Sequence, residues 1–155
     1  MTDREGMRLA IDKAAEGVRS GQTPFGACIV RDGAVLACSH NVVWATTDIT
    51  AHAEITALRE ACRAAGTIDL TGAVIYSTCE PCPMCFSACH WARIRRVVFG
   101  AGIADAQAAG FNELALSNDQ IRSISGSPVA VEGGFMRAEC VRLFDQWLAR
   151  SGRPY

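Results

Sequence analysis

Apolar residues recur along this chain with two different spacings, and the spacing changes from segment to segment. In some stretches they return every three to four residues, which is the period of a helix that buries one face. In shorter stretches apolar residues form compact runs bounded by Gly, Asp or Pro, as strands of a buried sheet do. The predicted helices are 3–20, 52–65, 83–92 and 135–149, and the predicted strands are 25–30, 34–38, 73–77, 96–100 and 128–131.

The order of these elements predicts the fold class. Asp32-Gly33 between the first two strands is typical of a tight hairpin turn, so those strands should pair antiparallel. The later strands alternate with helices, which predicts parallel pairing and helices on both faces of the sheet. We therefore expect a three-layer α/β/α sandwich with a mixed five-stranded sheet, formed by residues 1–155 as a single domain. The stretches 40–50 and 110–127 are polar or irregular and are expected to be loops, and 104–109 is rich in Ala.

The composition limits the partners and the compartment. The net charge is −1, and only Lys13 among the 15 cationic residues is Lys, so no basic field is present to attract nucleic acid. No leader-like apolar segment and no uninterrupted apolar run of membrane-spanning length occurs, which predicts a cytoplasmic protein without a membrane partner. Four of the eight cysteines stand singly in apolar segments, as buried thiols do in a reducing compartment. These are Cys28, Cys38, Cys62 and Cys140.

Two short motifs carry candidate chemistry. His52-Ala53-Glu54 is followed about thirty residues later by Pro81-Cys82-Pro83-Met84-Cys85. One imidazole and two thiolates occupy three corners of a zinc tetrahedron and leave the fourth open for water, as in catalytic zinc sites. We expect one Zn²⁺ per chain, bound by His52, Cys82 and Cys85. Glu54 is not required as a ligand and is predicted to be the catalytic general acid and base.

The same residues have a simpler interpretation. A lone C-x-x-C is often a redox pair or half of a structural zinc site, and such a site needs a fourth ligand. Cys79 and Cys89 are the candidates, and neither repeats the C-x-x-C spacing. The predicted helices place His52 and the cysteine pair at helix N-termini, where the helix dipole favours thiolates.

The two motifs together resemble those of zinc-dependent base deaminases. Residues 23–116 are similar to the cytidine/deoxycytidylate deaminase superfamily, and more closely to its guanine deaminase branch. The segments that carry this resemblance are Thr23-Pro24-Phe25-Gly26-Ala27, Asp32-Gly33, Asn41, Thr50 to Glu54, Thr78 to Cys85, Trp91-Ala92-Arg93 and Ala109-Gly110-Phe111, together with a tyrosine as last residue.

The resemblance implies a homodimer that hydrolyses a free purine base, with guanine giving xanthine and ammonia. It also implies a set of base-contacting residues, among them the backbone N–H of Ala53 and a final segment, 152–155, that closes over the base. The other implied contacts are Phe25, Asn41, Trp91, Glu113 and Tyr155. Asn112-Glu113 stands where guanine deaminases typically have Asp-Asp, which leaves the exact base open.

Several alternatives remain at this level. Phe25 and Trp91 are also what an ordinary core contains, and Asn41 is a common turn residue. Guanosine, cytosine and s-triazines present a similar C–N bond to such a site. A tRNA adenosine deaminase shares the motifs but needs clustered Lys and Arg for phosphates. A non-enzymatic zinc-binding module is disfavoured by Glu54, since structural zinc requires no base.

Overall fold

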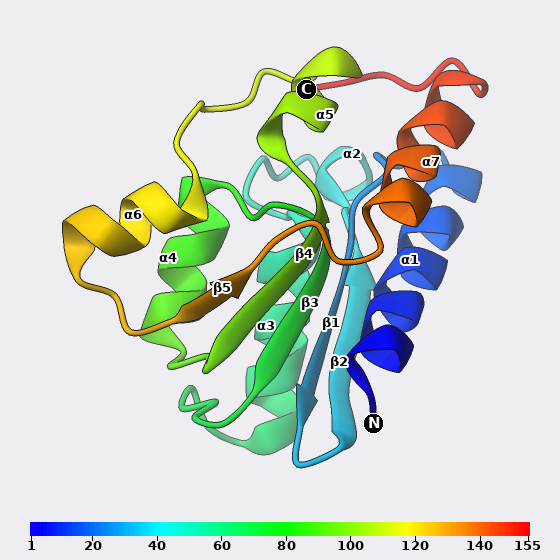
Figure 1. The fold of residues 1–155 in the computed structure, drawn as a ribbon. Helices are drawn as coiled ribbons and strands as arrows, with labels where there is room; N and C mark the ends of the chain where they lie inside the picture. Colours follow the sequence, from blue (N-terminus) through cyan, green and yellow to red (C-terminus); the bar gives the residue numbers. More distant parts are fainter.

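Five strands form one mixed sheet at the centre of the molecule. The computed structural model describes residues 1–155, and the strand order across the sheet is β2-β1-β3-β4-β5 (Figure 1). The strands are β1 (Gly26–Arg31), β2 (Ala34–His40), β3 (Val74–Cys79), β4 (Arg96–Ala101) and β5 (Ala130–Glu132). β1 pairs antiparallel with both β2 and β3, whereas β3, β4 and β5 run parallel. The predicted sandwich with a mixed five-stranded sheet is therefore confirmed.

The β1–β2 hairpin turns where the sequence predicts it. Asp32 and Gly33 have φ angles of 52° and 78°, and positive φ at both central residues is the geometry of the tight turn that matches strand twist. Cys28 and Cys38 lie opposite each other in this hairpin and are joined by a disulfide. The expectation that these two cysteines are single buried thiols is thus wrong. It failed because residues ten apart become neighbours only once the hairpin register is fixed.

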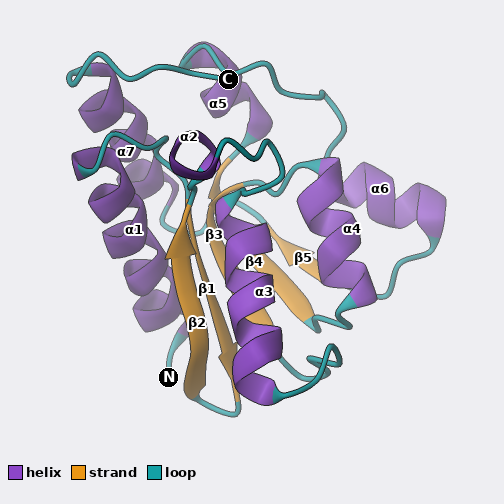
Figure 2. Cartoon of the chain, turned by 180° about the vertical axis from the view of Figure 1, so that it is seen from behind, coloured by secondary structure: helices purple, strands orange, loops and turns teal.

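Helices cover both faces of the sheet. Two helices, α1 (Asp3–Arg19) and α7 (Arg137–Leu148), pack on one face, and α3 (Ala53–Ala65) and α4 (Pro83–Trp91) pack on the other (Figure 2). Alternate strand residues point to opposite faces, so Tyr76 and Val98 join the first core while Ile75 and Val97 join the second. None of these helices has the length and apolarity needed to cross a membrane.

Three short helices lie outside the layers, and two of them correct the expected loops. α2 (Val43–Thr46) lies in the stretch 40–50, α5 (Ile103–Ala108) covers most of the Ala-rich segment, and α6 (Asn118–Ser125) lies in the stretch expected to be irregular. α6 begins with a reciprocal cap, in which Ser117 accepts from the Gln120 N–H and the Gln120 side chain accepts from the Ser117 N–H. Gly126 ends it in the left-handed conformation.

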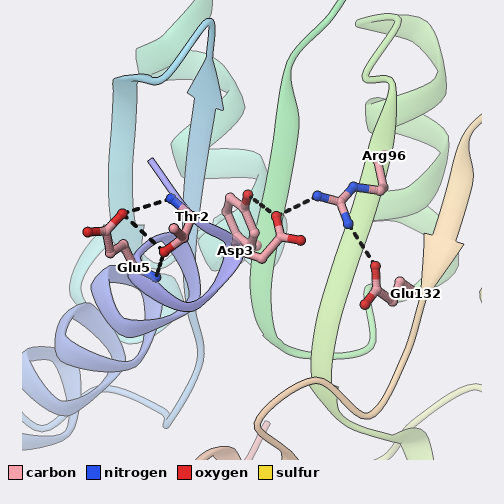
Figure 3. Close-up of polar contacts among 6 residues, drawn as sticks. Thr2, Asp3, Glu5, Arg96 and Glu132 are labelled. Carbon is pink, nitrogen blue, oxygen red and sulfur yellow. Dashed lines mark hydrogen bonds and ion pairs between the residues drawn. The ribbon is translucent and has the colours of Figure 1, made fainter.

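A polar network joins the start of α1 to the parallel strands. Arg96 of β4 lies between Asp3 and Glu132 and forms ion pairs with both (Figure 3). The Tyr76 hydroxyl donates to the Asp3 carboxylate over 2.6 Å. The hydrogen bond from Arg96, followed by that from Tyr76, lowers the pKa of Asp3. This network therefore favours the folded state only while Asp3 is ionised.

Candidate active site

The candidate residues meet at one edge of the sheet because of the strand directions. β1 runs antiparallel to β2 and β3, so the start of β1 lies beside the ends of β2 and β3. Phe25 directly precedes β1, Asn41 directly follows β2, and Cys79 is the last residue of β3. The N-termini of α3 and α4 reach the same edge, with His52 and Cys82 as their capping residues.

Three potential metal ligands converge there. The His52 Nδ1 atom lies 3.6 Å from the Cys82 and Cys85 sulfurs, and the two sulfurs are 3.6 Å apart. Tetrahedral zinc with its usual bond lengths to sulfur and nitrogen separates such ligand atoms by about 3.5–3.8 Å. The arrangement therefore has the right size for one zinc ion without rearrangement. All three residues are at least partly buried.

The protein environment favours the thiolate form of Cys82, whereas the contact with Cys82 raises the pKa of the Cys85 thiol. Contact with Cys85, followed by that with the His52 ring, lowers the pKa of Cys82 to about 4. The backbone N–H groups at the start of α3 and α4 add positive potential, because neither helix has a side-chain cap. A deprotonated sulfur is what zinc binding requires.

Glu54 lies beside this cluster without completing it. Its side chain is buried, its Oε2 atom is 3.5 Å from the Cys85 sulfur, and its Oε1 atom accepts a hydrogen bond from Ser77 at 3.1 Å. Burial raises the pKa of Glu54, which brings the carboxyl group closer to the range useful for proton transfer. Ser77, which the sequence did not point to, fixes one carboxylate oxygen and leaves the other toward the cluster.

A small cavity opens onto these residues, and Tyr155 forms part of its wall. The site cavity measures about 20 Å³, which is room for roughly one water molecule. The Tyr155 hydroxyl accepts a hydrogen bond of 2.7 Å from Asn41 Nδ2, and its ring lies 5.5 Å from the His52 ring. The residues lining the cavity are Phe25, Asn41, His52, Glu54, Cys79, Glu80, Cys82, Glu113 and Tyr155.

Two contacts between Trp44 and Arg153, called here the Trp44–Arg153 latch, hold the segment that carries Tyr155 against α2. The Trp44 indole N–H donates to the Arg153 carbonyl oxygen at 3.0 Å, and the Arg153 guanidinium lies 3.8 Å from the centre of the Trp44 ring. Figure 1 shows this segment running from the end of α7 across the top of the molecule toward α2 and α5. Trp44 was not identified from the sequence, since a tryptophan in a Thr-rich loop carries no signal of its partner.

Most of the predicted base-contacting residues line this cavity, and one does not. Phe25, Asn41, Glu113 and Tyr155 all do, and Ala53 is the first residue of α3 beside His52. Trp91 is 75% exposed at the end of α4 and lines other surface grooves instead. Trp91 therefore does not line this cavity, and its predicted contact with the base stays a prediction. Its motif neighbours are close in sequence, but nine residues of α4 carry it away from Cys82.

Glu113 lines the cavity without a hydrogen-bond partner among the other side chains. Burial, together with the charge of Cys82, raises the pKa of Glu113. Cys79, the last residue of β3, and Glu80, which follows it, also line the cavity. The cavity thus combines one amide donor, three carboxylates and aromatic walls around the metal-ligand cluster.

The fold and this cluster define a zinc-dependent deaminase. Residues 1–101 match the family model of the cytidine and deoxycytidylate deaminase zinc-binding region, so the chain belongs to this family. It is a hydrolase that acts on a C–N bond with a zinc cofactor, and His52, Cys82 and Cys85 are the residues that could hold the ion.

Individual relatives include two kinds of deaminase. The chain is 46% identical over 108 residues to guanine deaminase of Bacillus subtilis, covering 69% of each chain. It is 46% identical over 95 residues to the tRNA-specific adenosine deaminase of Agrobacterium fabrum, covering 61% of this chain and 62% of the relative. The structure of guanine deaminase from Nitrosomonas europaea superposes with a TM-score of 0.88 at 25% identity, over 96% of this chain and 85% of that one. The matched segments span about two thirds of the two curated relatives.

Proposed function

We propose that this chain deaminates guanine, converting guanine and water into xanthine and ammonia. The observation that carries the proposal is the position of Tyr155, which lines the site cavity and accepts a hydrogen bond from Asn41. A cap made by residues 152–155 can cover a free base, whereas a nucleotide within a polynucleotide needs an open path for its backbone on both sides.

The chemistry of the cavity residues agrees with hydrolysis of an amidine. A zinc ion, when bound, supplies Lewis acidity that makes a water proton removable near neutral pH. Glu54 takes the proton from the attacking water and delivers it to the ring nitrogen beside the carbon under attack. A second transfer through the same carboxylate protonates the amine, which leaves as ammonia when the C–N bond breaks. The Ser77 bond to Oε1 keeps the carboxylate in one orientation during these transfers.

The donors and acceptors of the cavity match the edge of guanine. Asn41 Oδ1 already accepts from the Val43 N–H at 3.0 Å, and one Nδ2 hydrogen is donated to Tyr155, so Asn41 has one amide N–H left for a ligand. Guanine has carbonyl and ring-nitrogen acceptors for such a donor, and its ring N–H is a donor for Glu113. Adenine has no ring N–H at the six-membered ring and would leave an ionised Glu113 without a partner. A buried unpaired group discriminates strongly between such substrates.

The second candidate is adenosine deamination on tRNA, which is supported by the equally similar tRNA-specific relative. Against it stand the position of Tyr155 in the cavity wall, the net charge of −1 and the single lysine, Lys13. A substrate panel distinguishes the two. Purified zinc-loaded protein is given guanine, guanosine, cytosine, adenine or tRNA, and ammonia is measured.

We expect ammonia from guanine, and we expect Glu113→Ala to lower kcat/KM for guanine by about 100-fold or more, because the ring N–H loses its acceptor. Glu139→Ala on α7 is the matched control, since it removes a half-buried carboxylate outside the cavity. Turnover of tRNA but not of guanine would reject the proposal and support the second candidate.

We also propose that the protein works as a homodimer. The outer face of α3 and α4 carries an apolar groove of about 490 Å³ that includes Leu58, Ile68 and Trp91. Ile68 and Trp91 are 78% and 75% exposed, which is unusual for such large apolar side chains in one groove. A second copy of the chain would remove this surface from water. Light scattering should give twice 16.6 kDa, and Trp91→Ser should shift the mass toward the single chain.

A further inference from the structure

Helix α6 is anchored to the segment that leads into the zinc ligand Cys82. Its first residue, Asn118, is completely buried. The Asn118 side-chain Nδ2 donates to the Pro81 carbonyl oxygen at 2.6 Å, and the Asn118 backbone N–H donates to Glu80 Oε1 at 2.8 Å. One residue therefore contacts both positions that directly precede Cys82.

The bond to Pro81 fixes the orientation of a particular peptide group. The Pro81–Cys82 peptide is trans, so the Pro81 carbonyl and the Cys82 N–H lie in one rigid plane and point in opposite directions. Holding the carbonyl therefore also sets the direction of the Cys82 N–H. That N–H donates to no acceptor within the protein, and it belongs to the residue that caps α4 and carries the metal-binding sulfur.

The side chain of Asn118 is not needed to begin α6. That task is performed by the reciprocal cap between Ser117 and Gln120. At the first helical position an aspartate would suit the helix dipole better than asparagine. Burial of Asn118 is also costly, because its Oδ1 atom is buried without a hydrogen-bond partner. What asparagine supplies here, and aspartate does not, is the N–H donor to Pro81.

We propose that Asn118 is a positioning residue that orients the Pro81–Cys82 peptide and thereby the zinc ligand Cys82. The same anchor ties the segment that carries Glu113 to the segment that carries Cys82, since α6 follows Glu113 by a few residues. This inference rests on the proposed function only in that the site is a zinc deaminase site. It does not depend on which base is the substrate.

The test compares Asn118→Asp, Asn118→Ala and Gln120→Ala. Gln120→Ala is the matched control, because it weakens the start of the same helix without touching Pro81. Each protein is loaded with Co²⁺ to record the thiolate charge-transfer and d–d absorption bands. Each is also loaded with Zn²⁺ to measure the rate of metal release to a chelator. Both readouts are taken without substrate, so they remain informative even if guanine is not turned over.

We expect both Asn118 variants to shift the cobalt bands and to release zinc about 10- to 100-fold faster, with a comparable fall in kcat, as loss of a hydrogen bond to a ligand-bearing group does. Asn118→Asp should be at least as damaging as Asn118→Ala, because its carboxylate oxygen faces the Pro81 oxygen. Gln120→Ala should retain the wild-type spectrum while lowering thermal stability slightly.

Three results would overturn the proposal. The first is a wild-type spectrum and release rate in Asn118→Asp, and the second is an equal change in Gln120→Ala. The third is failure of the isosteric Asn118→Asp variant to fold, which would make the residue structural. If only Asn118→Ala fails to fold, the comparison of Asn118→Asp with wild type decides the question.

Discussion

Replacing Glu54 by glutamine tests the proton-transfer role with little change in shape. The amide retains the volume of the side chain and can still accept from Ser77, which lies 3.1 Å from Oε1. It cannot carry the proton. Loss of a positioned general acid and base costs about 10²–10⁴ in rate. This corresponds to about 3–5 kcal/mol in activation free energy.

The structure also predicts what Glu54→Gln leaves intact. Glu54 is not among the three converging ligands, so zinc content should stay near one per chain. Burial raises the pKa of Glu54, which shows that the charged form is costly to bury. The neutral amide should therefore leave thermal stability unchanged or slightly higher.

The assay combines ammonia release, zinc analysis by mass spectrometry and a thermal melt. Glu60→Gln is the matched control, since it makes the same change on the exposed part of the same helix, where Glu60 accepts from Ser39. It should retain wild-type kcat. A Glu54→Gln protein with full kcat would refute the catalytic role. A Glu54→Gln protein that lost its zinc would show that Glu54 acts on metal binding instead.

Three further predictions concern other parts of the molecule. Deleting residues 152–155 should lower kcat/KM by about 10- to 100-fold through loss of the cap, with little change in the melting temperature, whereas full activity would show that the cap is dispensable. The pKa of Asp3 is lowered in the folded state, so its stabilisation exists above the unfolded pKa of about 4 and disappears as the pH falls through the folded value. Urea unfolding should accordingly give Asp3→Asn a free energy of unfolding about 1 kcal/mol below that of the wild type at pH 7, and this difference should vanish at low pH. A difference between the two proteins that does not change with pH would contradict the link to ionisation. Replacing both Cys28 and Cys38 by serine should lower the free energy of unfolding by about 3 kcal/mol, and intact mass should show the wild type lighter than its reduced form by two hydrogens.

The layered fold could be predicted because local signals and tertiary structure agree. The period of apolar residues marks α1, α3 and α7, Pro83 marks the start of α4, and Asp32-Gly33 marks the hairpin turn. Helix α6 was missed because its apolar content is low, although its Ser-x-x-Gln cap and Gly126 are visible in the sequence. That cap could have predicted the start of α6 from the sequence.

The site likewise contains residues that the sequence predicts and residues that it does not. His52, Glu54, Cys82 and Cys85 are recognisable because fixed spacing on two helices is enough to bring them together. Contacts between segments that are distant in sequence produce no recognisable spacing. The Trp44–Arg153 latch joins residues 109 positions apart, and Asn118 reaches Pro81 across 37. Such pairs depend on how layers and loops pack, which no local pattern encodes.

Hydrolysis of guanine in ¹⁸O-labelled water tests the central claim most directly. The account predicts that the zinc-loaded protein forms one xanthine for each ammonia and that the new carbonyl oxygen comes from water. Mass spectrometry should therefore show xanthine carrying a single ¹⁸O atom, with none formed by Glu54→Gln on the same timescale. Unchanged guanine, or xanthine without the label, would contradict the account.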